Sequence, residues 1–145
     1  MIAIRILQAV GTRNSQEWVT KFGFDEDKHP AYLTMALGAG SVTPMQMATG
    51  YSVFANGGMR VQPHIITRVT DHKGKILVDS PAQLVDEANR AISSRNAFVM
   101  TSLLQEVTRS GTAAKARVAL KRDDIYGKTG TTNDSMDAWF AGYHR

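Results

Sequence analysis

Five residues near the end of the chain, Gly127-Lys128-Thr129-Gly130-Thr131, combine a cation, hydroxyl groups and flexible backbone. In a strand, alternation would place Lys128 and Gly130 on one face and Thr129 and Thr131 on the other. The absent side chain at Gly130 would let the backbone of a peptide ligand pair with the strand edge. Threonine hydroxyls beside a lysine suit a carboxylate, and a backbone N–H could face a developing oxyanion.

Two other interpretations of these residues compete with a peptide-binding strand. A phosphate-binding loop requires Gly-x-x-x-x-Gly-Lys-Ser/Thr, but Arg122 stands where the first glycine belongs. The segment also runs into a hairpin rather than a helix, which excludes that loop. An edge strand whose lysine opposes aggregation and whose glycine marks a bulge stays open, because Lys-Thr-Gly alone is weak evidence.

The composition excludes several other kinds of site. The chain has no cysteine, so disulfides, zinc–thiolate sites and a cysteine nucleophile are ruled out. Its four histidines lack metal-ligand spacing, and no metal or cofactor is predicted. The net charge of +4 is scattered, and residues 115–122 are basic without aromatic residues, so nucleic acid is not an expected partner. No apolar run approaches the roughly 18–20 residues of a membrane helix.

Apolar spacing and capping residues predict the elements before the lysine strand. A helix over residues 2–10 ends at Gly11, and Ser15 caps a short helix that Gly23 closes. Thr43 and Pro44 begin a further helix. That helix carries Met47, Tyr51 and Phe54 on one face and ends at residues 56–58.

The second half of the chain alternates strands with a longer helix. Residues 61–79 predict a hairpin with its turn at 71–74. Ser93 or Ser94 caps a helix through Arg109. The core stripe expected on this helix is Val99, Met100, Leu103, Leu104 and Val107.

The last predicted elements are two strands, 125–132 and 137–144, after a loop or short helical turn at 111–119 and with a connection at 133–136. Trp139 and Phe140 are assigned to the core, because consecutive large apolar residues fit a strand covered on both faces. The predicted fold class is α+β, with a mainly antiparallel sheet flanked by helices.

Longer stretches of the chain resemble a known family. Residues 128–133 (KTGTTN) and 137–143 (DAWFAGY) are similar to the third active-site motif and following strand of the penicillin-binding transpeptidases. Residues 37–58 resemble the family's Ser-x-x-Thr-Pro-x-x-Met-Ala helix segment, and residues 107–116 its Gly-Thr-Ala loop. The resemblance covers essentially the whole chain and is closest to the class A (bifunctional) members of the 1A type.

The resemblance implies roles for the lysine strand. Lys128 and Thr131 would be catalytic, with Lys128 supplying charge toward a serine of the Ser-x-Asn motif and the Thr131 N–H donating to the oxyanion. Four further residues would bind substrate: Thr129, Gly130, Thr132 and Asn133. The expected ligands are peptidoglycan stem peptides ending in D-Ala-D-Ala, and β-lactams.

The family's nucleophile is absent from this sequence, because no serine is followed by lysine at the third position. Ser94-Arg95-Asn96 matches Ser-x-Asn, but we interpret Ser94 as a helix N-cap. The resemblance therefore implies that residues 1–145 are a partial transpeptidase domain that lacks the Ser-x-x-Lys and Ser-x-Asn segments and the last strands and helix. Met1 would then be an internal methionine.

The intact protein is expected to cross-link stem peptides through a serine acyl-enzyme at the periplasmic face of the bacterial inner membrane. The family implies a glycosyltransferase domain and a membrane anchor outside this stretch, and other cell-wall synthesis proteins as possible partners. This chain alone is expected to be inactive. Two alternatives stay open: a serine β-lactamase-like hydrolase, and a non-catalytic module that binds peptidoglycan or a partner.

Overall fold

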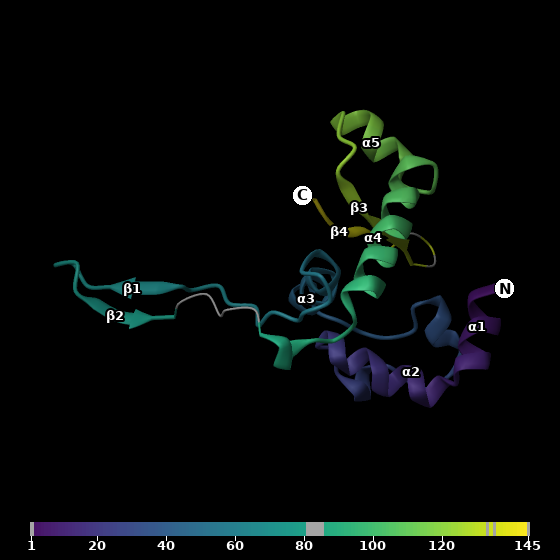
Figure 1. The fold of residues 1–145 in the computed structure, drawn as a ribbon, viewed down its shortest axis with the longest axis horizontal. Coiled ribbons are helices and arrows are strands. Elements are labelled where there is room, and N and C mark those ends of the chain that lie inside the picture. Colours follow the sequence, from purple (N-terminus) through teal and green to yellow (C-terminus); the bar gives the residue numbers. More distant parts are fainter. Residues whose placement is uncertain (1, 81–85, 133, 135, 145) are drawn as a thin grey trace.

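The computed structural model describes residues 2–80, 86–132, 134 and 136–144. The structure combines helices with two separate antiparallel pairs of strands, which confirms the predicted α+β class, and the helices pack against the second of these pairs (Figure 1). Met1, Asn133 and Ser135 lie outside the described residues. The elements in chain order are α1 (Ile2–Val10), α2 (Thr12–Val19), η1 (Thr20–Phe22), η2 (Glu26–Lys28), η3 (Leu33–Leu37), α3 (Pro44–Ala55), β1 (Arg68–Thr70), β2 (Ile76–Asp79), η4 (Glu87–Asn89), α4 (Ser94–Arg109), α5 (Ala114–Leu120), β3 (Ile125–Thr131) and β4 (Ala138–His144).

The first two helices are joined by a single glycine. Gly11 has a φ of 95°, a value that residues with a Cβ rarely adopt, so α2 begins directly after α1. The prediction that Ser15 caps the second helix is wrong, because Ser15 already lies inside α2 and its hydroxyl donates to the Gly11 carbonyl at 3.0 Å. Gly23, with a φ of 91°, ends η1 as predicted.

Helix α3 begins as the sequence predicts. Thr43 Oγ1 accepts a hydrogen bond from the Gln46 backbone N–H at 3.1 Å, and the Gln46 side chain accepts one from the Thr43 N–H at 2.9 Å. Pro44 occupies the first turn. These bonds satisfy backbone donors that a helix start leaves unpaired, so the position of α3 is defined by its own residues.

A small core joins the N-terminal helices to α3 and α4. Its buried members are Phe22, Val53, Ile92 and Ala97. The Phe22 ring also lies 5.5 Å from the ring of Phe54, measured between centroids. Within the part of the chain that is described, no helix is long and apolar enough to span a membrane.

Helix α4 packs against β3 through a face that the apolar pattern does not predict. Its buried residues are Ala97, Thr101, Leu104 and Thr108. Of the predicted stripe only Leu104 is buried, whereas Val99 and Leu103 are 50% and 56% exposed.

The reason is the hydrogen bonding between α4 and the strands. Thr108 Oγ1 donates to the Ile125 carbonyl at 2.7 Å, and the Thr101 hydroxyl lies 2.6 Å from the hydroxyl of Tyr143. Because threonine side chains are short, the helix lies close to the strands, and the tyrosine rings provide most of the apolar contact area. Tyr126 and Tyr143 stack with ring centroids 5.3 Å apart.

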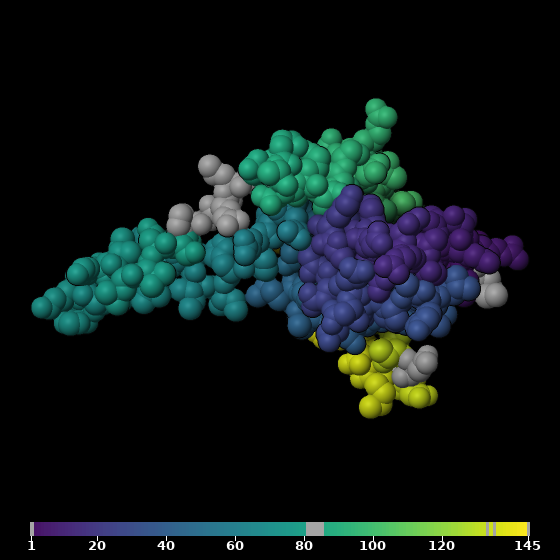
Figure 2. Space-filling view, turned by 90° about the horizontal axis from the view of Figure 1, so that it is seen from below, coloured from purple at the N-terminus to yellow at the C-terminus, as the bar shows by residue number. Residues whose placement is uncertain are grey.

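Strands β1 and β2 form a hairpin that projects from the rest of the molecule (Figures 1 and 2). All residues of both strands are exposed. The turn is closed by Asp71, whose Oδ1 accepts from the backbone N–H groups of Lys73 and Lys75 at 2.8 and 2.9 Å. The predicted hairpin is therefore present, with strands shorter than the predicted runs.

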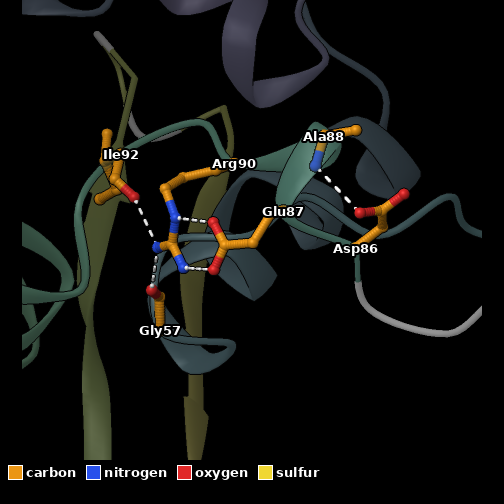
Figure 3. Close-up of polar contacts among 6 residues, drawn as sticks. All are labelled: Gly57, Asp86, Glu87, Ala88, Arg90 and Ile92. Carbon is orange, nitrogen blue, oxygen red and sulfur yellow. Dashed lines mark hydrogen bonds and ion pairs between the residues drawn. The ribbon is translucent and has the colours of Figure 1, made fainter.

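Arg90 binds the turn that follows α3 and the segment that leads into α4 (Figure 3). Its guanidinium makes two hydrogen bonds of 2.6 Å to Glu87, and its Nη1 donates to the carbonyls of Gly57 and Ile92 at 3.1 and 3.2 Å. The hydrogen bond from Arg90 lowers the pKa of Glu87. One side chain thus connects the end of α3 with the segment that enters α4.

The assignment of Trp139 and Phe140 to the core is wrong. Their side chains are 58% and 42% exposed. The strand pair is covered where Tyr143 meets α4, and Trp139 lies near the other end of β4. The Phe140 ring instead covers two paired glycines: a Cβ on Gly127 would lie 2.5 Å from Phe140 Cζ, and one on Gly142 would lie 3.0 Å from its Cε1.

Candidate active site

Strand β3 has one paired edge and one open edge. It pairs with β4 from Ile125 opposite His144 to Thr131 opposite Ala138. Among the residues described, no strand pairs with its other edge. The open strand margin expected from the sequence is therefore present, and in Figure 2 this yellow end of the chain stands out from the body.

The first half of β3 is held by the helices and the second half is free. Ile125, Tyr126 and Gly127 are buried, and α4 binds this end through Thr108. Exposure begins at Lys128 and continues to Thr131, with Thr129 partly buried. The strand is therefore anchored at one end and presents the lysine-containing half to solvent.

The structure brings Lys128 and Thr129 together, although strand alternation directs their side chains to opposite faces. The Lys128 amine donates to the Thr129 carbonyl at 2.9 Å and lies 3.3 Å from Thr129 Oγ1. A lysine stem is long enough to curl around a strand edge, which places the charge beside the threonine hydroxyl.

A residue that the sequence analysis did not select completes this group. Thr112, in the Gly-Thr-Ala loop after α4, has its Oγ1 3.3 Å from the Lys128 amine and 2.9 Å from Thr129 Oγ1. The sequence identifies this loop only through its resemblance to the family's Gly-Thr-Ala loop. Its contact with the lysine strand depends on tertiary packing, which local sequence does not report.

Gly130 borders empty space. No heavy atom lies within 4 Å of the position that a Cβ on Gly130 would take, and its φ is not positive. Neither packing nor backbone conformation therefore requires glycine here. Gly127 is the contrast, because a Cβ there would lie 2.6 Å from the Ala141 carbonyl oxygen.

Thr131 and Thr132 lie at the end of the strand. The Thr132 hydroxyl accepts from the Asp137 N–H at 2.8 Å, and the Thr132 N–H donates to the Asp137 carbonyl at 3.1 Å. These bonds bridge the connection between β3 and β4. Thr131 is exposed opposite Ala138, and Asn133 lies outside the described residues.

Ser94 lies far from this group. The cap of α4 is Ser93, whose Oγ accepts from the Asn96 N–H at 3.2 Å, so the assignment of Ser94 as N-cap is wrong and Ser94 is the first helical residue. Helix α4 runs from Ser94 to Arg109, so at about 1.5 Å per residue Ser94 lies about 22 Å from the end of the helix, where the loop that carries Thr112 begins. Ser94 therefore cannot act together with Lys128 in this arrangement.

An ion pair lies directly before the strand. Arg122 makes two hydrogen bonds to Asp124, at 2.8 and 2.6 Å. The hydrogen bond from Arg122 lowers the pKa of Asp124 from 3.8 to about 2. On the covered side of the sheet, burial raises the pKa of Tyr51, and Tyr143 adds to that effect.

Comparisons with known proteins give one consistent result. The family model "Penicillin binding protein transpeptidase domain" matches residues 1–145. Penicillin-binding protein 1A of Neisseria flavescens is 47% identical over 99% of this chain and 18% of its own length, and that of Pseudomonas aeruginosa is 37% identical over 99% and 23%. The chain thus spans about a fifth of the length of these relatives.

Solved structures that resemble this chain come from the same kind of protein. A crystal structure of penicillin-binding protein 1A from Haemophilus influenzae matches with a TM-score of 0.87 and 34% identity, over 98% of this chain and 26% of that one. The D,D-transpeptidase domain of a peptidoglycan glycosyltransferase from Eggerthella lenta matches with a TM-score of 0.73 and 21% identity, over 97% and 42%. The second likeness concerns the fold alone.

Proposed function

Because this chain belongs to the penicillin-binding protein transpeptidase family, we propose that it forms part of a peptidoglycan DD-transpeptidase, an acyl-transfer enzyme. The substrate would be a stem peptide ending in D-Ala-D-Ala, and β-lactams would acylate the same site. The observation that carries this proposal is the open half of β3, where Lys128, Thr129 and the empty space over Gly130 lie together.

The chemistry would proceed in two acyl transfers. A serine hydroxyl attacks the carbonyl between the two D-alanines, loses its proton to a base, and releases D-alanine as the peptide bond breaks. An amine of a neighbouring stem peptide then attacks the ester, which forms the cross-link and frees the serine. The sequence holds no Ser-x-x-Lys, so that serine would come from polypeptide outside these 145 residues.

The lysine strand would bind and orient the substrate. Lys128 supplies positive charge, Thr129 and Thr132 contact the substrate with Asn133, and Gly130 leaves room for the peptide backbone. The Thr131 N–H would donate to the oxyanion; loss of such a donor lowers transition-state stabilisation by roughly 2.7–4 kcal/mol in other enzymes. Residues 1–145 would be the C-terminal part of this domain, inactive alone.

The setting of the intact protein follows from the same family. We place the domain at the periplasmic face of the bacterial inner membrane, attached by an anchor outside this stretch and accompanied by a glycosyltransferase domain. Its partners would be peptidoglycan and other proteins of cell-wall synthesis.

Labelling with fluorescent penicillin tests the proposal. The full-length protein should bind one equivalent covalently and release it slowly, whereas the 145-residue chain should bind none. Rapid turnover of the penicillin would instead indicate a β-lactamase-like hydrolase. Absence of any covalent adduct on the full-length protein would favour a non-catalytic peptidoglycan-binding module and overturn the proposal.

A further inference from the structure

Thr112 lies in a closed group of three polar atoms with Lys128 and Thr129. The Lys128 amine is 3.3 Å from the hydroxyl oxygen of each threonine, and the two hydroxyl oxygens are 2.9 Å apart. Thr112 and Lys128 are 16 residues apart in the chain, so this group exists only because the loop after α4 packs against β3.

The backbone on both sides of Thr112 is fixed. The Gly111 N–H donates to the Glu106 carbonyl at 3.2 Å, and the Ala113 N–H donates to the Val107 carbonyl at 3.1 Å. Ala113 is 4% exposed, and a Cβ on Gly111 would lie 2.8 Å from the Val107 Cα. Thr112 is itself exposed, so its hydroxyl is held at the open edge of β3 by its neighbours rather than by its own burial.

Counting donors shows what the group offers to a ligand. A lysine ammonium has three N–H donors, and here three oxygens surround it: the Thr129 carbonyl and the two threonine hydroxyls. One threonine O–H donates to the other hydroxyl, 2.9 Å away, and either threonine can be the donor. One O–H is then left over, polarised by the ammonium, to donate to an external acceptor.

We infer that Thr112 is a positioning residue for a carboxylate-bearing ligand on β3: it holds the Lys128 amine and the Thr129 hydroxyl in the orientation that presents this free O–H. The inference rests on the proposed function and adds a residue to its site. Without the Thr112 hydroxyl, the lysine loses one of its acceptors and Thr129 loses its hydroxyl partner.

The test compares two ligands on the full-length protein. Benzylpenicillin carries a free carboxylate, and its methyl ester does not. Thr112→Val should lower the acylation rate constant with the free acid about tenfold, the factor that about 1.4 kcal/mol gives, and change the rate with the ester less than about twofold. Thr112→Ser should restore the free-acid rate, because it keeps the hydroxyl.

Ser110→Ala is the matched control, since it removes a hydroxyl from the same loop that bonds Glu106 instead of the lysine. Melting temperatures are measured for every variant, and Thr112→Ala replaces Thr112→Val if the latter is destabilised. Equal losses with acid and ester, or no loss at all, would overturn the inference while leaving the proposed function in place. If the unaltered protein is not acylated, the proposed function itself fails.

Discussion

Replacing Gly130 by valine separates ligand binding from folding more cleanly than other changes on β3. No heavy atom lies within 4 Å of the new Cβ and the backbone is not in a glycine-only conformation. A surface change of this kind usually alters the free energy of unfolding by no more than about 0.5 kcal/mol. The melting temperature of Gly130→Val should therefore stay close to that of the unaltered protein.

The effect on a ligand should be much larger. Valine would fill the space through which a peptide backbone reaches the open edge between Lys128 and Thr131. In an edge strand, every second residue points its backbone N–H and C=O groups toward the open edge. A ligand that pairs with residues 128–131 therefore makes about two backbone hydrogen bonds, each worth about 0.5–1.5 kcal/mol. Their loss corresponds to about a five- to 150-fold lower acylation rate constant.

The assay is the acylation rate of the full-length protein with fluorescent penicillin, measured beside thermal unfolding. Gly130→Ala is the graded control, because its single methyl group intrudes less than valine and should give a smaller loss. A normal acylation rate for Gly130→Val, with unchanged stability, would refute the idea that ligands pair with this strand edge.

Three further changes test the packing around the site. Gly127→Ala should lower the free energy of unfolding by about 1–3 kcal/mol, measured in urea, because its Cβ would lie 2.5 Å from Phe140 Cζ; unchanged stability would contradict the close approach. Tyr143→Phe removes the hydroxyl that lies 2.6 Å from Thr101 Oγ1, while Thr101 keeps its bond to the Ala97 carbonyl. This change should lower the free energy of unfolding by about 1 kcal/mol, and an unchanged urea midpoint would contradict the contact. The pKa of Asp124 is about 2 in the folded protein and 3.8 ordinarily. The stabilisation that its ion pair adds to the free energy of unfolding is therefore fully present above about pH 3.8 and is lost as the pH falls toward 2. Arg122→Gln should raise that pKa toward its ordinary value in a carboxyl NMR titration, because the hydrogen bond from Arg122 is the largest cause of the lowered pKa. A titration that does not shift would refute the Arg122 contact as its main cause.

The elements with local signals could be predicted from the sequence. Thr43 and Pro44 define the start of α3 through bonds within four residues, and Gly11 and Gly23 mark turns by their positive φ. The predicted cap at Ser15 is wrong because a serine before apolar residues also fits inside a helix, where its hydroxyl can donate to the carbonyl four residues earlier.

What depends on distant neighbours could not be predicted in the same way. The face of α4 that is buried is chosen by hydroxyl partners on β3 and β4, so the apolar stripe misplaced the core. Trp139 and Phe140 are predicted to be buried because consecutive large apolar residues fit a strand covered on both faces, yet both are exposed on the described β3–β4 pair. Lys128, Thr129 and Gly130 are consecutive, so the sequence alone indicates them, whereas Thr112 joins them only in three dimensions.

A crystal structure of the full-length protein acylated by a penicillin tests the central claim most directly. The account predicts that the ligand backbone lies along the open edge of β3 beside Gly130, with its carboxylate within hydrogen-bond distance of Thr129. A ligand bound to the serine but turned away from residues 128–131, or another strand already paired with that edge, would contradict it.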